Sequence, residues 1–141
     1  MSVKEEDNKL FFFSNIYQNF QIQEYLTFNL PNSLTNALTK LRISAHSLLI
    51  EKGRHFRPKL ERKNRLCNIC NELEDEKHFL LYCQKFTNLR SELFSALNIQ
   101  INDLCPRNTY CNSVVKKLMN PVNKDETFYI CNFITSCFNI R

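Results

Sequence analysis

The sequence predicts an all-α fold, a small helical domain with an inserted structural zinc knuckle. Glycine occurs once in the 141 residues and proline four times, so the tight hairpins of a sheet protein lack their usual turn residues. Apolar residues recur at three- and four-residue intervals in several segments, which is the period of helices packed on one another. One run of cysteines and a histidine, residues 67–83, interrupts this pattern with the spacing of metal ligands.

Residues 1–8 are polar and predict a disordered tail, and residues 9–141 predict a single helical domain that contains the knuckle at 65–84. The most regular apolar pattern lies in residues 33–51, where we expect one long helix. Gly53 stands where a left-handed residue would end that helix. The remaining expected helices span residues 10–20, 74–82, 86–97, 109–118 and 125–138.

The metal prediction depends on the spacing C-x2-C-x7-H-x4-C, formed by Cys67, Cys70, His78 and Cys83. Three thiolates and one imidazole are a zinc ligand set, and four protein ligands leave no open position, so we expect one structural zinc ion. Residues five apart on an ideal helix point about 140° from each other, so the helix must loosen or end near Cys83 if it is to bind together with His78. The alternative is a set of ordinary buried cysteines and a core histidine.

The other four cysteines, residues 105, 111, 131 and 137, have no such spacing. We expect these four cysteines to be small core residues, and a second metal site is the less favoured alternative.

Charge is distributed unevenly along the chain, whose formal net charge is +5. Nine Lys or Arg residues lie between positions 40 and 65, against only Glu51 and Glu61, and the acidic stretch 72–76 then reverses the sign. A basic surface favours a polyanionic partner, here RNA or DNA. The predicted contact residues are Lys40, Arg42, His46, Arg54, Arg57, Lys59, Arg62, Lys63 and Arg65.

Catalysis has little support in the sequence. A Cys–His nucleophile would have to come from the predicted metal ligands, and a single glycine cannot form a phosphate-binding loop, so we expect neither an enzyme nor a small-molecule substrate. No apolar run reaches the ~20 residues of a membrane span. Seven cysteines without an export signal favour a reducing compartment, so the expected location is the cytoplasm or the nucleus.

Residues 35–95 resemble the C-terminal zinc-binding region of non-LTR (LINE-type) retrotransposon reverse transcriptases. The resemblance is carried by Leu41-Arg42, His46, residues 51–54, Arg65 with the two cysteines after it, and the block 76–81 before Cys83. It implies an accessory region that follows a polymerase and binds template RNA or target DNA, without polymerase activity of its own. Many relatives have a proline after the last ligand, where this chain has Gln84.

Two other functions stay open. The aromatic stretch 10–20 or the acidic stretch 72–76 could dock onto a polymerase domain or another protein chain, which would make the molecule a zinc-stabilised protein-interaction module. The chain could also be a decayed element fragment without function.

Overall fold

The computed structural model describes residues 8–16, 22–100 and 109–141, and in these residues the chain is mostly helical with no strand. The predicted disordered tail lies almost entirely outside the described residues. The α-helices are α2 (Phe11–Ile16), α3 (Asn32–Arg42), α4 (Leu49–Lys52), α5 (Thr87–Ala96), α6 (Thr109–Met119) and α7 (Lys124–Ile140). The five 3-10 or π turns are η1 (Glu24–Thr27), η2 (Gly53–His55), η3 (Arg62–Asn64), η4 (His78–Tyr82) and η5 (Gln84–Phe86).

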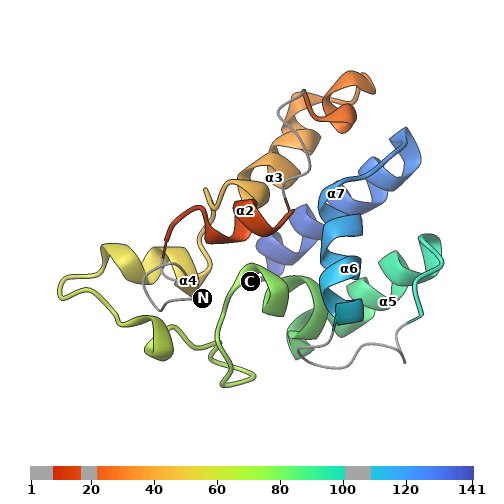
Figure 1. Cartoon of the computed structure of the whole chain (residues 1–141). Coiled ribbons are helices and arrows are strands. Elements are labelled where there is room, and N and C mark those ends of the chain that lie inside the picture. The colour runs from red at the N-terminus through yellow and green to blue at the C-terminus, as the bar shows by residue number, and fades with distance from the viewer. Residues whose placement is uncertain (1–7, 17–21, 101–108) are drawn as a thin grey trace.

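Helix α7 organises the core, because it packs against both α3 and α5 (Figure 1). Its buried face includes Ile130, Ile134 and the two cysteines Cys131 and Cys137, which confirms the prediction that these two are core residues. Burial raises the pKa of Cys131 to about 11 and that of Cys137 to about 12, so both thiols are neutral. The side chains of the cysteines at 105 and 111 lie outside the described residues.

The prediction of one helix over 33–51 is wrong, because α3 ends at Arg42 and α4 begins only at Leu49. Ser44 takes the left-handed conformation (φ 59°) that ends α3. The amide of Ala45 then donates to the carbonyl of Lys40 and that of Ser44 to the carbonyl of Leu41, which is the hydrogen-bond pattern of a Schellman C-cap. The chain therefore turns in the middle of the apolar pattern.

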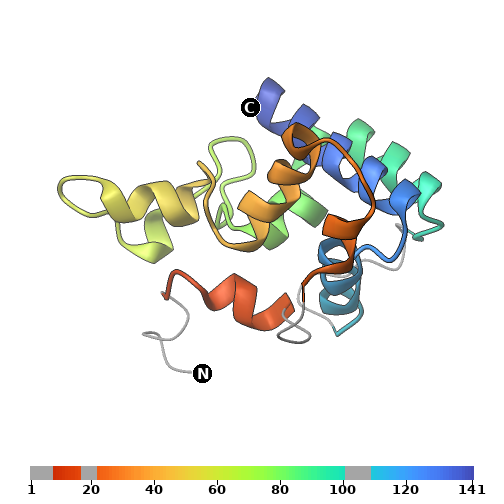
Figure 2. The same ribbon diagram turned by 90° about the horizontal axis from the view of Figure 1, so that it is seen from above.

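Residues 49–65 form a lobe that extends from the helical body at one side, as Figure 2 shows. A buried arginine closes the base of this lobe. Arg65 is 0% exposed, and its guanidinium donates to the carbonyl oxygens of Ile50 and Leu60, each at 3.0 Å. The beginning and the end of the lobe are thus held by one side chain.

Gly53 does not have the predicted left-handed conformation, since its φ is −63°. Instead, steric crowding by Arg65 explains why glycine occupies this position. A Cβ atom at this position would lie 2.9 Å from Cγ of Arg65 and 3.0 Å from its Cδ. Because hydrogen bonds to two backbone carbonyls fix this arginine, it cannot move aside without losing a bond.

We expect Gly53→Ala to destabilise the protein by roughly 1–3 kcal/mol through overpacking against Arg65. At a helical φ without this contact, the same substitution would stabilise by about 0.4–1 kcal/mol through the unfolded chain. The free energy of unfolding in urea distinguishes the two signs, with the exposed Ser91→Ala as the control that should stay within about 0.5 kcal/mol of the parent. A stabilised Gly53→Ala variant would contradict the packing explanation.

Candidate metal centre

The first cysteine pair lies on a tight turn between two extended segments. Leu66 and Leu73 form an isolated antiparallel bridge, and the amide of Cys67 donates to the carbonyl of Glu72 at 2.7 Å. Asn71 reverses the chain in the left-handed conformation (φ 56°), which asparagine tolerates better than most residues. This turn directs the thiols of Cys67 and Cys70 toward the same point.

The second pair lies on a π turn, which resolves the angular problem posed by the spacing of His78 and Cys83. The amide of Cys83 donates to the carbonyl of His78 at 2.8 Å, five residues back, where an α-helix would close after four. The wider turn brings side chains five apart to the same side. The predicted loosening of the helix near Cys83 is therefore confirmed.

Two charged side chains hold the ends of this π turn. At its start, the carboxylate of Asp75 accepts the amide hydrogen of His78 at 2.8 Å, and burial raises the pKa of this carboxyl to about 6. At its end, the buried Arg90 donates to the carbonyl oxygens of Leu80 and Cys83, each at 2.9 Å. These contacts satisfy backbone groups that a π turn leaves without a regular helical partner.

Gln84 stands where the resemblance implies a proline, and its backbone has a direct contact with the cluster. The amide nitrogen of Gln84 lies 3.3 Å from Sγ of Cys70 and donates a hydrogen bond to it. A proline has no amide hydrogen and could not make this bond. The departure from the family pattern therefore adds a donor to one of the four candidate ligands.

Cys67, Cys70, His78 and Cys83 offer one ligand atom each, and these four atoms lie within 4.8 Å of one another, so the cluster could hold a metal ion. Cys67, His78 and Cys83 are buried, and Cys70 is half-buried. No other group of this kind is found in the described parts of the chain.

His78 supplies an independent indication of a ligand. Both of its ring nitrogens are buried and neither has a hydrogen-bond partner among the described residues, although Oε2 of the exposed Glu72 lies 3.5 Å from Nδ1. Burial lowers the pKa of His78 and favours the neutral imidazole, the form that binds metals. Burial also raises the pKa of the Cys83 thiol to about 12, so this group loses its proton only when a cation compensates the charge.

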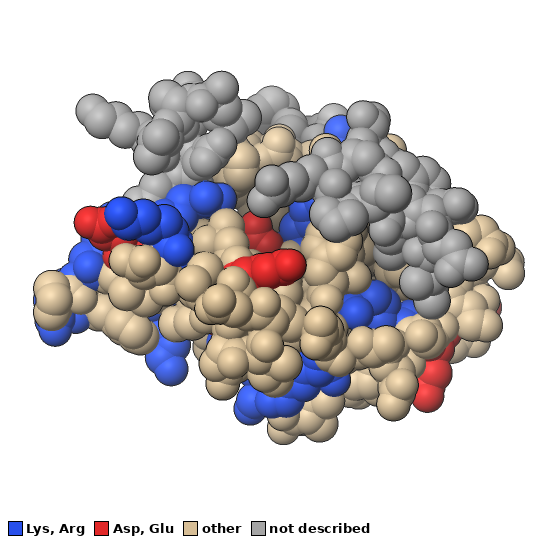
Figure 3. All heavy atoms as spheres, turned by 90° about the horizontal axis from the view of Figure 1, so that it is seen from below, with Lys and Arg blue, Asp and Glu red and all other residues tan. Residues whose placement is uncertain are grey.

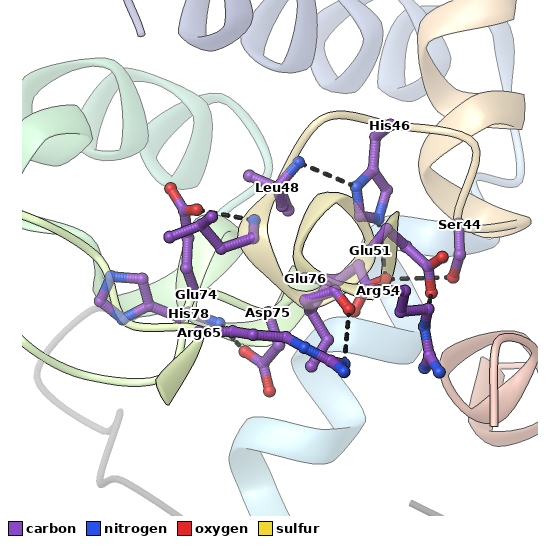
Figure 4. Close-up of polar contacts among 12 residues, drawn as sticks. Ser44, His46, Leu48, Glu51, Arg54, Arg65, Glu74, Asp75, Glu76 and His78 are labelled. Carbon is purple, nitrogen blue, oxygen red and sulfur yellow. Dashed lines mark hydrogen bonds and ion pairs between the residues drawn. The ribbon is translucent and has the colours of Figure 1, made fainter. Parts of the chain in front are cut away.

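The acidic stretch after the cysteine turn holds the connection between α3 and α4 (Figure 4). Oε1 of Glu76 accepts from Ser44 Oγ at 3.1 Å and contacts Nε2 of His46 at 2.8 Å. The amide of Leu49 donates to Oε2 of Glu74 at 2.7 Å, and the guanidinium of Arg141 forms a bidentate pair with the same carboxylate. Both glutamates are buried, which argues against the acidic stretch as an exposed docking surface.

The sequence analysis did not predict that Glu74 and Glu76 stabilise the fold. Their hydrogen-bond partners are at least 25 residues away in the chain. The spacing within the acidic stretch carries no signal of these contacts.

Three of the residues predicted as nucleic-acid contacts have buried side chains. Arg42 is 2% exposed and donates to the carbonyl of Met119 and to Oδ1 of Asn120, which joins α3 to the end of α6. Arg65 is buried at the base of the lobe, and the side chain of His46 is 2% exposed between Glu76 and the ring of Phe138. Charge counting placed these side chains on the surface because it cannot detect a distant backbone or carboxylate partner.

The other predicted contacts have accessible side chains. Arg57, Lys59 and Lys63 are exposed, and Arg54 and Arg62 are half-buried, all on the lobe. Lys40 is exposed on α3 and lines a separate groove between α3 and α7. Lys and Arg side chains gather at the left-hand end of the face in Figure 3, over the lobe.

The chain matches no model of a known protein family, no curated protein and no solved structure. Among the described helices, none is both long enough and apolar enough to cross a membrane.

We expect Glu76→Ala to lower the free energy of unfolding by at least about 2 kcal/mol, because two buried donors lose their acceptor and each costs roughly 1–3 kcal/mol. The control is Glu92→Ala, which removes an exposed carboxylate from α5 and should change stability by less than about 0.5 kcal/mol. Equal effects of the two substitutions in urea unfolding would show that Glu76 does not hold the α3–α4 connection.

Proposed function

We propose that the Cys67–Cys70–His78–Cys83 cluster holds one structural zinc ion, and that this ion stabilises a nucleic-acid-binding accessory module without catalytic activity of its own. The donor set supports zinc over other metals, because thiolates and imidazole are the ligands of tetrahedral zinc sites. Two sulfurs bonded to one tetrahedral zinc ion lie about 3.8 Å apart. The Sγ atoms of Cys67 and Cys83 are 3.9 Å apart, which matches that distance.

The number of protein ligands supports a structural role for the ion. Four protein ligands fill the tetrahedron, so no position stays open for a substrate or an activated water. The ion would connect the cysteine turn at 67–70 with the π turn at 78–82. Structural zinc ions contribute apparent binding free energies of roughly 10–16 kcal/mol near neutral pH, which is large compared with the stability of a small domain.

The observation that carries the nucleic-acid proposal is the lobe at residues 49–65, which we call the basic lobe. Its Lys and Arg side chains extend from the helical body, and its base is fixed by Arg65, next to the zinc ligands in sequence. Phosphate contacts by such side chains give affinity without sequence information. Phe56 is 39% exposed on the same lobe and is available to stack on a base. The resemblance to the zinc-binding region of non-LTR retrotransposon reverse transcriptases favours the same function, with template RNA or target DNA as the partner.

A protein-interaction module is the second candidate. Val122 just before α7 is 61% exposed, and Phe128 and Tyr129 within α7 are each 44% exposed. Apolar docking depends little on salt, whereas phosphate binding weakens steeply with it, so a salt titration separates the two functions.

Replacing one ligand should remove metal, fold and binding together. In Cys70→Ser or His78→Ala the site keeps three of its four ligands, so we expect loss of zinc by native mass spectrometry, faster proteolysis within residues 62–90, and loss of RNA binding. The matched control is Cys131→Ser, a buried cysteine outside the cluster, which should keep its zinc. Full zinc occupancy in both ligand variants would refute the assignment of these ligands.

Neutralising the basic lobe should change binding and leave the fold intact. We expect Arg57→Gln, Lys59→Gln and Lys63→Gln together to make the log–log salt slope for single-stranded RNA shallower by about 2, at ~0.7 per phosphate contact, with zinc content unchanged. The control replaces Lys85, Lys117 and Lys124, three exposed lysines outside the lobe, with Gln. If both triple variants change the slope equally, the lobe has no special part in binding and only net charge matters.

A further inference from the structure

A cavity of about 370 Å³ lies between the basic lobe, α2 and α6. Helix α2 contributes Phe11 and Phe12 to its wall, α6 contributes Asn112 and Val115, and Ile50 belongs to the start of the lobe. Helix α2 contacts α6, and in Figure 2 it lies below the lobe with one end toward α6. The volume is within the range of about 300–1,000 Å³ typical of sites for small ligands.

The charges around this cavity favour an anion. Five cationic side chains line it, two from the lobe and three from other segments of the chain: Arg54, Arg62, Lys9, Lys77 and Lys116. Lys9 and Lys116 are exposed, so their ammonium groups are available to a ligand that enters from solvent. The sequence pattern pointed only to the two arginines, because the three lysines lie outside the basic stretch 40–65.

The three carboxyl groups at the cavity already have partners within the protein (Figure 4). Glu51 pairs with Arg54 at 3.0 Å, Glu76 accepts from Ser44 and contacts His46, and Asp75 accepts the amide hydrogen of His78. Glu51 and Glu76 are each 4% exposed. The carboxylates therefore serve the fold, while Lys9 and Lys116 remain exposed. The ammonium of the half-buried Lys77 donates to Oδ1 of Asn112 at 2.8 Å.

The apolar wall favours a ligand with a flat ring. Phe11 and Phe12 are half-buried and Val115 is buried, so the lining of the cavity includes aromatic and apolar side chains as well as cations. A nucleotide has both parts, since its base stacks on aromatic side chains and its phosphate binds Lys and Arg. A free phosphate or a small carboxylate would leave the aromatic wall without a partner.

We infer that this cavity receives one nucleotide of a single strand, with the base against the aromatic wall and the phosphate at the lysines. The inference rests on the proposed nucleic-acid function and deepens it, because it adds a preference for single strands. Bases within a duplex are stacked and paired and cannot enter such a cavity unless the duplex opens. The basic lobe then binds the phosphates that precede or follow the inserted nucleotide.

The test fills the cavity without changing charge. In Asn112→Trp the indole occupies the space of the inserted base, and we expect affinity for a twelve-residue oligouridine to fall roughly 5- to 150-fold, the range that stacking of one base supplies. Affinity for an RNA hairpin duplex should change less than about twofold, since duplex binding uses only phosphates. The matched control is Asn36→Trp, the same substitution in the groove between α3 and α7, which should leave both affinities unchanged.

A second variant guards against a folding defect in Asn112→Trp. Lys9→Gln with Lys116→Gln leaves the wall intact and removes two exposed cations, so it should weaken oligouridine binding and leave the thermal unfolding midpoint unchanged. Unchanged oligouridine affinity in both cavity variants, with weakened binding in the lobe variant, would overturn the cavity and leave the proposed function standing. If the parent protein binds neither the oligouridine nor the hairpin duplex, both the cavity inference and the proposed nucleic-acid function are wrong. Uridine 5′-monophosphate bound as tightly as the oligouridine would overturn the single strand as the source of the nucleotide.

Discussion

The π turn at His78–Tyr82 is the constraint on which the rest of the structure depends. It places His78 and Cys83 on one side, which a regular helix could not do at a spacing of five residues. The turn is held from three directions, by the carboxylate of Asp75 at its start, by the guanidinium of Arg90 at its end, and by the ring of Phe79 in the core. A local departure from α-helical geometry thus lets His78 and Cys83, which are five residues apart, belong to one ligand cluster.

Buried carboxylates then connect the metal-ligand region to the helices around it. Glu74 and Glu76 follow directly from the cysteine turn and bind the connection between α3 and α4, including Ser44, His46 and Leu49. Each carboxylate satisfies backbone or side-chain donors that would be costly to bury alone. Loosening the cluster of candidate metal ligands is therefore expected to loosen the base of the basic lobe, because both depend on residues 65–76.

Local patterns in the sequence predicted much of the fold and the ligand set. The helices α5, α6 and α7 lie close to their expected ranges, because their apolar periodicity is uninterrupted. The four candidate ligands could be found because their spacing is itself the signal. The break between α3 and α4 was not predictable in this way, since the apolar period continues through it and a serine, not a glycine, takes the left-handed conformation.

The candidate binding surface was only partly predictable, for a related reason. Counting charges treats all arginines alike, yet Arg42, Arg65 and Arg90 are buried and donate to backbone carbonyls, two of them across long sequence separations. Conversely, Lys77 and Lys116 line the cavity beside the lobe although their local sequence gives no such indication. Burial of a charge depends on tertiary partners, which a linear pattern does not contain.

X-ray absorption at the zinc edge of the purified, metal-replete protein tests the central claim most directly. The cluster predicts one zinc ion per chain with three sulfur neighbours at about 2.3 Å and one nitrogen neighbour at about 2.0–2.1 Å. The same measurement on His78→Ala should find no stoichiometric zinc, because the site has lost one of its four ligands. A first shell of oxygen and nitrogen alone in the parent protein, or a parent protein without stoichiometric zinc, would contradict the account.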